Sequence, residues 1–362
     1  METASKIKTD KKEKSKVLFI KPFMYKRPSI SSVVIRMLVL LSIQAIMLLF
    51  TKSYSAFTVI IASTLGAVCA SAINYLISHD QPFNIMNIIT QGMMIGLLLP
   101  EKYPLVIVFF ISFTSLSISR CLVFKSINSW INCSAVAVII AWIIGASYFP
   151  PFTITADLIP LRNSSLYLIQ NGSFPIYSFD ASITAFLNST VFDWFKVTIP
   201  EGYISLLWDS HSIIPAFRFN IITIISSIII FSDNAFSGII PSLFLIIYGL
   251  LVRLFAPLMF GGYFNQGDIL LAIFSSGTLF CATFMIQWYG TIPTTVTGKV
   301  VLGILSGILA FFIVGCGTSP IGIAYTVLIT NIISMFIKAF EEKQNLVSTV
   351  RVVNKIAAKG GN

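Results

Sequence analysis

Ten apolar runs separated by short breaks constrain this chain more than any other feature of its sequence. They cover roughly residues 33–52, 55–77, 87–100, 104–120, 133–150, 219–232, 237–255, 269–289, 300–317 and 321–338. Because one membrane crossing takes about 20 apolar residues, the runs are numerous and long enough for about ten crossings. Of the 362 residues, 56% are hydrophobic and 10% charged, against about 25% charged in soluble domains. This composition excludes a water-soluble enzyme and predicts a polytopic membrane protein.

The runs predict helices, and therefore an all-α fold. A lipid-facing backbone must satisfy its hydrogen bonds within its own segment, and the runs are longer than the ~10 residues of a barrel strand. Two runs, 87–100 and 219–232, are short and would cross only with flanking residues or as broken helices. The predicted parts are a basic N-terminal segment (1–32), five transmembrane helices (33–150), a long loop (151–218), five further helices (219–338) and a C-terminal tail (339–362).

The distribution of basic residues predicts the orientation. Residues 1–36 hold ten of the 24 lysines and arginines. With the N-terminus in the cytoplasm, 18 basic residues fall on the cytoplasmic side and six on the outer side, as the positive-inside rule requires. Both termini are then cytoplasmic and loop 151–218 is outside. The net charge of +10 is thus interpreted as a topology signal that also attracts membrane lipid, with no nucleic-acid partner.

A candidate internal repeat links the third and eighth runs. The stretches Gly92–Pro104 (GMMIGLLLPEKYP) and Gly277–Pro293 (GTLFCATFMIQWYGTIP) both open with glycine, continue apolar and end at proline. They are five spans apart, so a five-helix repeat would be inverted in the membrane, as in many transporters. The alternative is that glycine and proline are simply common in membrane helices.

Few residues in this chain are suited to chemistry of their own. The sequence has no CxxC, HExxH, GxGxxG or GxxxxGK[ST] motif, so we predict no catalytic residue and no metal site. Polar groups in or beside the spans are amides, namely Asn74, Asn87, Gln91, Gln287 and Asn331, and no Asp or Glu lies at a span centre. Because a proton relay normally uses a carboxylate, any ion coordination would favour Na⁺. The alternative is that the amides only hold helices together. Trp194, Trp208 and Trp288 are interpreted as interfacial belt residues.

The chain resembles the NqrB/RnfD family, the flavin-bearing membrane subunits of Na⁺-translocating quinone reductase and of Rnf complexes. Pro320, Gly322, Ala324, Tyr325, Leu328 and Asn331 follow the family run P-x-G-x-A-[FY]-x-x-L-x-x-N, and Gly277, Ala282, Phe284, Thr294, Thr295, Gly298 and Lys299 fall at the family's spacing. Gly92, Leu97, Pro100 and Pro104 match an upstream segment, and Pro22-Phe23 resembles the usual start. The length favours the Rnf branch, with the chain as a divergent member of the RnfD type.

Several family motifs are altered here. The flavin-associated loop ending Phe-Asn-Pro-Ala reads FKSINSWINCS over 124–134, a Thr-Asp-Pro is replaced by Gln287-Trp288-Tyr289, and Ile321 stands at an acidic position. In the family, a flavin phosphate is esterified to the last threonine of an outer-loop Asp-x-x-[Ser/Thr]-x-Ala-Thr motif.

The corresponding stretch here runs from Asp180 to Phe186 (DASITAF). Asp180 and Ala185 match the motif, and Phe186 occupies the acceptor position. Thr184 is the nearest hydroxyl and Ser182 an alternative, so the resemblance implies Thr184 as the candidate for covalent FMN, with Asp180 beside it. The alternative for both hydroxyls is an ordinary polar loop.

The resemblance implies a membrane subunit of an Rnf-type complex, in the bacterial cytoplasmic (inner) membrane, that couples electron transfer through flavins to Na⁺ or H⁺ export. The implied cofactors are FMN and riboflavin, and the implied partners are other complex subunits, including an extracytoplasmic flavoprotein. The chain would not be an enzyme alone. Two alternatives remain: a scaffold subunit that has lost its flavin, and a small-solute transporter or channel built from the inverted repeat.

Overall fold

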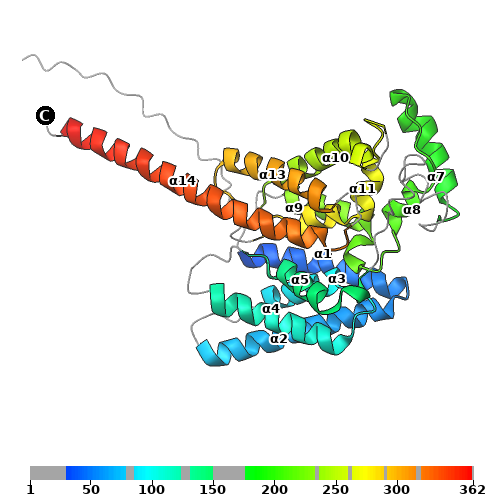
Figure 1. Ribbon diagram of the computed structural model, residues 1–362, viewed down its shortest axis with the longest axis horizontal. Helices are drawn as coiled ribbons and strands as arrows, with labels where there is room; N and C mark the ends of the chain where they lie inside the picture. Colours follow the sequence, from blue (N-terminus) through cyan, green and yellow to red (C-terminus); the bar gives the residue numbers. More distant parts are fainter. Residues whose placement is uncertain are drawn as a thin grey trace, which may run out of the picture.

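The computed structural model describes residues 30–78, 85–123, 131–149, 176–232, 236–259, 263–288, 292–314 and 319–360, and within these ranges the chain is helical without a β-strand. Figure 1 shows a bundle of long helices, with α14 projecting at one end and the short helices α7 and α8 at the other. We call these the tail end and the arm end. The predicted all-α class is confirmed, and the chain is a polytopic membrane protein with long apolar helices.

Each predicted span corresponds to a helix or to a broken helix. The first five are α1 (Ile30–Phe50), α2 (Tyr54–Ser78), α3 (Ile85–Leu98), α4 (Leu105–Val123) and α5 (Cys133–Gly145). The second five are α9 (Asn220–Ser232), α10 (Ile239–Met259), a broken segment, α13 (Val296–Val314) and α14 (Gly322–Gly360). The broken segment contains α11 (Ile269–Ser275), α12 (Thr278–Phe280) and the π-helix η6 (Cys281–Met285). The two runs predicted to be short, α3 and α9, have 14 and 13 residues.

The break between α11 and α12 occurs at Gly277. Its φ is +70°, a conformation that side-chain-bearing residues rarely adopt, and a Cβ at this position would overlap the ring of Phe217. The amide of Asn220 donates hydrogen bonds to the carbonyls of Phe274 (2.9 Å) and Leu206 (3.0 Å). The break therefore has its own hydrogen-bond partner on α9, as membrane depth requires.

The helix α14 continues through the predicted boundary between the last span and the C-terminal tail. It has 39 residues, about 58 Å at 1.5 Å per residue, whereas the hydrocarbon core is about 30 Å thick. Figure 1 shows its last turns extending beyond the other helices. Residues 1–29 of the predicted N-terminal segment and 151–175 of the predicted long loop lie outside the described residues.

The packing repeats between the two halves. In the first half α2 packs mainly on α3 and α4, and in the second α10 packs mainly on α13 and also on α11 and η6. Corresponding helices also meet across the centre, because α1 contacts α9 and α5 contacts α14. Gln44 of α1 donates to the hydroxyl of Thr223 of α9 at 2.9 Å. This pairing is the one that a five-plus-five repeat predicts, and an odd number of spans inverts the second half.

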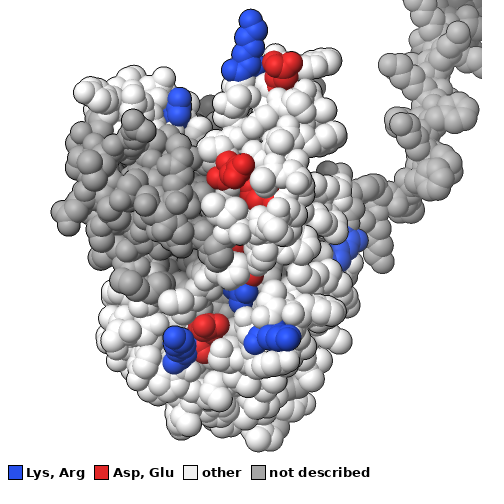
Figure 2. Space-filling view, turned by 90° about the vertical axis from the view of Figure 1, so that its right-hand side faces the viewer, with Lys and Arg blue, Asp and Glu red and all other residues white. Residues whose placement is uncertain are grey.

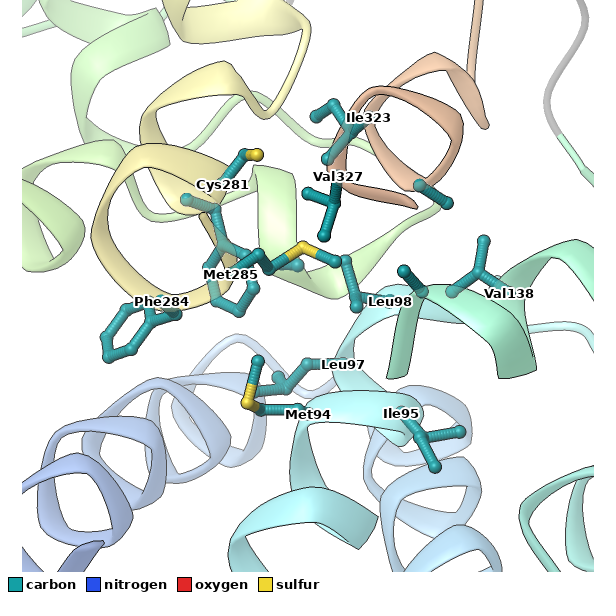
Figure 3. Packing of buried hydrophobic residues seen from close by; sticks show 14 of the residues in the cluster. Met94, Ile95, Leu97, Leu98, Val138, Cys281, Phe284, Met285, Ile323 and Val327 are labelled. Atoms are coloured by element: carbon teal, nitrogen blue, oxygen red, sulfur yellow. The ribbon is translucent and has the colours of Figure 1, made fainter. Parts of the chain in front are cut away.

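The centre of the bundle is closed by apolar side chains from both halves. Figure 3 shows Met94 and Leu97 of α3 facing Phe284 and Met285 of η6, with Val327 of α14 nearby. All five side chains are fully buried. Interdigitation of this kind is typical of close-packed protein interiors.

A close approach between α2 and α3 depends on Gly96. A Cβ at this position would lie 2.6 Å from the Cα of Ile60 and would also overlap the hydroxyl of Ser63. That hydroxyl donates to the carbonyl of Gly92 at 2.8 Å. Small residues allow such contacts in membrane helices, where van der Waals packing drives association.

Replacing Gly96 by alanine is therefore expected to destabilise the protein by about 1–3 kcal/mol, the usual cost of overpacking, because the backbone of α2 cannot move away locally. Thermal unfolding of the detergent-solubilised protein measures the effect. Gly238→Ala is the matched control, since its Cβ would have its nearest neighbour at 3.9 Å. Equal stability of the two variants would contradict the assigned contact.

Candidate functional site at the arm end

The motif residues from 180 to 186 fall on a helical projection at the arm end. It consists of α7 (Asp180–Leu187), the π-helix η3 (Asn188–Phe192) and the short helix η4 (Asp193–Phe195), which together we call the arm. Figure 1 shows the arm lying crosswise to the long helices of the bundle. It rests on α8 (Tyr203–Trp208), which in turn contacts α9 and α11.

Asp180 fixes the base of the arm. Its buried carboxylate accepts hydrogen bonds from the backbone N–H of Gly202 (2.8 Å) and from both the N–H and the hydroxyl of Ser205 (2.6 Å each). The hydroxyl of Thr184 donates to the same carboxylate at 3.0 Å. Burial raises the pKa of Asp180, but these hydrogen bonds outweigh it and hold the pKa below its ordinary value.

The two hydroxyls named as FMN candidates lie in different environments. Thr184 is 4% exposed and its hydroxyl points at Asp180, whereas Ser182 is exposed. Phe186, at the family's acceptor position, is 64% exposed and one helical turn beyond Ser182. The exposed residue at the acceptor position is therefore a phenylalanine, which has no hydroxyl to esterify. The hydroxyl of Thr184 is buried against Asp180, and this arrangement does not fit a phosphoester at Thr184.

A buried ion pair joins the segment after α8 to the bundle. The guanidinium of Arg218 binds Asp209 through two hydrogen bonds, Nε to Oδ1 at 3.0 Å and Nη2 to Oδ2 at 2.6 Å, and both side chains are buried. A third hydrogen bond runs from Nη1 to the hydroxyl of Ser53, between α1 and α2, at 2.5 Å. The backbone N–H of Glu101, after α3, donates to the carbonyl of Ile213 at 3.0 Å. This segment therefore connects both halves of the bundle.

A third acid, Asp268, connects α8 to the broken span. The hydroxyl of Tyr203 donates to Asp268, whose other carboxylate oxygen accepts from the N–H of Leu271 and caps α11 at 3.0 Å. Burial is the main cause that raises the pKa of Asp268. Two buried carboxylates, Asp180 and Asp209, and the partly buried Asp268 thus position one short helix.

The sequence identified Asp180, but not the ion pair of Asp209 with Arg218 or the hydrogen bond of Tyr203 with Asp268. Asp209 and Arg218 lie nine positions apart in a polar stretch, and nothing in their spacing predicts that they pair. One signal in the sequence was the position of Arg218 directly before an apolar run, where a charge needs a partner.

The surface of the arm end carries charges of both signs. Figure 2 looks onto this end and shows scattered basic and acidic side chains on an otherwise uncharged surface. Among the described residues, no group of three His, Cys, Asp or Glu side chains is placed to hold a metal ion.

The tryptophans predicted to be belt residues differ in exposure, because Trp194 is 88% exposed while Trp288 is 3% exposed. Trp288 is therefore a packing residue, and the interpretation of it as a belt residue is wrong.

Buried polar atoms without partners occur within the bundle. Asn331 of α14 is 1% exposed, and neither its Oδ1 nor its Nδ2 has a hydrogen-bond partner among the described residues. The same holds for the hydroxyls of Thr330 and Ser134 and for Oε1 of Gln287, although Nε2 of Gln287 donates to Ser237. Thr330 and Asn331 lie on α14, which contacts both α5, where Ser134 lies, and η6, which ends two residues before Gln287. Unpaired buried amides are costly in lipid, so Asn331 needs a polar partner such as water or an ion.

The fold and the arm together define an integral membrane protein with two packed five-helix halves, covered at one end by a short helical layer held on buried acids. The chain belongs to the NQR2, RnfD, RnfE family, whose model matches residues 17–347. The resemblance noted from the sequence is thereby confirmed, and the chain is a membrane subunit of the Rnf/Nqr type. A comparison with curated proteins finds no match.

Proposed function

We propose that this chain is a subunit of an Rnf-type complex in the bacterial inner membrane, where electron transfer through flavins drives export of Na⁺ or H⁺. Family membership supports the role in a complex. The positive-inside count supports cytoplasmic termini, which assigns the tail end to the cytoplasm and the arm end to the outer side. The partners are then other Rnf-type subunits, with an extracytoplasmic flavoprotein at the arm end.

The unpaired amide of Asn331 is the observation that best supports an ion path in this chain. An amide that holds two helices together makes at least one hydrogen bond between them, as Gln44 does by donating from Nε2 to Thr223 while its Oε1 stays unpaired among the described residues. Asn331 leaves both polar atoms unpaired at membrane depth. An amide, a hydroxyl and carbonyls are ligands suited to Na⁺ rather than to a carboxylate-borne proton.

Replacing Asn331 by leucine separates the two roles of this residue. Removing a buried unpaired polar group for an apolar one of similar size is neutral or stabilising, so thermal stability is expected to stay equal or rise. Ion uptake by inverted vesicles containing the assembled complex is expected to fall at least several-fold. Ser71→Ala is the control, since its hydroxyl bonds its own helix at 2.9 Å. Unchanged uptake in Asn331→Leu would contradict the proposed path.

We propose that this chain carries no covalent FMN and serves as a scaffold subunit. In this role the hydroxyl of Thr184 binds Asp180 and does not carry a cofactor. The buried hydroxyl of Thr184 and its hydrogen bond support this assignment. Ser182 is the exposed hydroxyl on α7 and is the alternative attachment residue for FMN. Riboflavin, which needs no phosphoester, stays an expectation from the family.

Covalent flavin is tested by in-gel fluorescence of the denatured protein. The protein is expressed in a host that attaches flavin covalently to another family member, and that family member is the positive control. We expect no covalent fluorescence from the wild type, and the same from Thr184→Ala and Ser182→Ala. Fluorescence that disappears only in Thr184→Ala would contradict the scaffold role. Fluorescence that disappears only in Ser182→Ala would assign the cofactor to the exposed residue.

A small-solute transporter is the second candidate, because the broken span and the repeated packing are features of transporters. The closed apolar centre of the bundle weighs against a solute path through this chain alone. Solute uptake by liposomes that contain only this protein would favour the transporter.

A further inference from the structure

The arm has one apolar side that no part of the described chain covers. Ile183, Phe186, Val191 and Trp194 are all exposed, Trp194 by 88%. Ile183 and Phe186 are three positions apart on α7, and Val191 and Trp194 are three positions apart across η3 and η4, so each pair forms neighbouring exposed apolar side chains along the arm. An isolated apolar stripe of this kind in water would be unfavourable.

The exposure of this stripe follows from how the arm is held. The side of α7 that packs on α8 carries Asp180 and Thr184, which are buried and hydrogen-bonded. Further along, the side-chain amide of Asn188 makes two hydrogen bonds with the backbone of Ile199, at 2.8 and 2.9 Å. The arm therefore cannot rotate to bury its apolar side against α8 without breaking these bonds.

The position of the arm indicates what covers the stripe. Figure 1 shows it crosswise to the spanning helices at their end, which is the orientation of a helix lying in the plane of the membrane surface. Aromatic side chains at the same end of the spans are also exposed, namely Tyr54 at the start of α2 and Tyr263 and Phe264 after α10. Tyrosine and tryptophan rings concentrate at the boundary between lipid and water, so Trp194 continues this aromatic rim beyond the bundle.

The charges of the arm favour contact with a lipid surface, and this lipid does not need to be anionic. Asp193 is exposed in the last turn and Lys196 directly follows that turn, so the two opposite charges balance. A partner protein recognised by charge would need an excess of one sign, whereas insertion into neutral lipid needs only apolar and aromatic area.

We propose that the arm is an interfacial anchor, with Phe186 and Trp194 inserted at the headgroup–acyl boundary of the leaflet at the arm end. The anchor holds the short helical layer at the membrane surface. It is independent of the proposed ion path and of the cofactor, since it rests only on the orientation and exposed side chains of the arm.

Tryptophan quenching tests the anchor. The full-length protein is placed in phosphatidylcholine nanodiscs with or without lipid brominated on its acyl chains, and the emission of Trp194 is taken as the difference between wild type and Trp194→Phe. We expect brominated lipid to reduce this emission at least twofold, and acrylamide in the water to quench it weakly. Strong acrylamide quenching without bromine quenching would overturn the anchor and indicate a surface for a soluble partner. Protection from both quenchers would also overturn it, since Trp194 would then lie against protein.

Two variants on the same helix sharpen the result. Phe186→Asp on the apolar side is expected to reduce bromine quenching of Trp194 at least twofold, because a charge in the lipid boundary lifts the arm. Ser189→Asp, at an exposed polar position, is the control and should leave the quenching unchanged. Equal quenching in both variants would overturn the proposal. An unchanged elution volume and thermal transition establish that each variant is folded.

Discussion

Replacing Arg218 by methionine is expected to cost about 3–5 kcal/mol of stability, the usual penalty for leaving one member of a buried ion pair without its partner. Asp209 would then be a buried carboxylate without its cation, and among the hydrogen bonds of the described residues it would keep the one from the N–H of His211 at 2.8 Å. Ser53 would also lose its bond to the guanidinium. We expect a much lower thermal transition, and a reduced yield of folded protein in detergent.

The double variant Asp209→Asn with Arg218→Met measures how strongly the stability effects of the two side chains are coupled. A neutral amide opposite an apolar side chain leaves no uncompensated charge, so the double variant is expected to recover at least half of the loss. Lys52→Met is the control, because this lysine is exposed in the same turn as Ser53, and its effect should stay within about 0.5 kcal/mol. Additive losses in the double variant would show that the two side chains are not coupled.

The membrane architecture could be predicted because it follows from a strong local signal. Every apolar run is a helix or a broken helix, and the packing of α2 on α3 and α4 corresponds to that of α10 on α11, η6 and α13, in agreement with a five-plus-five arrangement. A broken helix was predicted as a possibility for the runs 87–100 and 219–232. The corresponding helices α3 and α9 are short but continuous. The break occurs instead in the run of 269–289, because Gly277 adopts a positive φ beside Phe217. That conformation depends on a tertiary contact with a residue far away in the chain, which no local pattern carries.

The candidate site was only partly predictable, for a related reason. The sequence identified Asp180 and two hydroxyls near it, but which hydroxyl faces the solvent depends on the side of α7 that packs on α8. Thr184 follows Asp180 by one helical turn and so shares its buried side, whereas Ser182 and Phe186 share the exposed one. A helix assignment for residues 180–187 would have shown from the spacing that Thr184 shares the side of Asp180, but not which side is buried. The partners Ser205 and Gly202 could not have been found in this way.

Replacing Asp180 by asparagine is expected to cost about 3 kcal/mol and to release the arm. The amide keeps one acceptor, but its NH₂ group would face donors that now bond the carboxylate, and each buried donor left unpaired costs about 1–3 kcal/mol. Thr184→Val removes a single donor and is expected to cost about 1 kcal/mol. Ser182→Ala, on the exposed side, should change stability by less than about 0.5 kcal/mol. Thermal unfolding gives the three values, and limited proteolysis within residues 176–200 reports release of the arm.

The pH dependence of the Asp180→Asn effect tests the assigned charge. The pKa of Asp180 is lower in the folded protein than its ordinary value of about 3.9, so its stabilising contribution is complete above that value and is lost as the pH falls through the folded pKa. The stability difference between wild type and Asp180→Asn should therefore be constant from pH 7 to about pH 5 and shrink below about pH 4. Comparing the two proteins at each pH cancels the other acids, Asp209 and Asp268 among them. A difference that instead grows on acidification would show that the folded protein binds the protonated form of Asp180, and that the four hydrogen bonds do not hold a carboxylate.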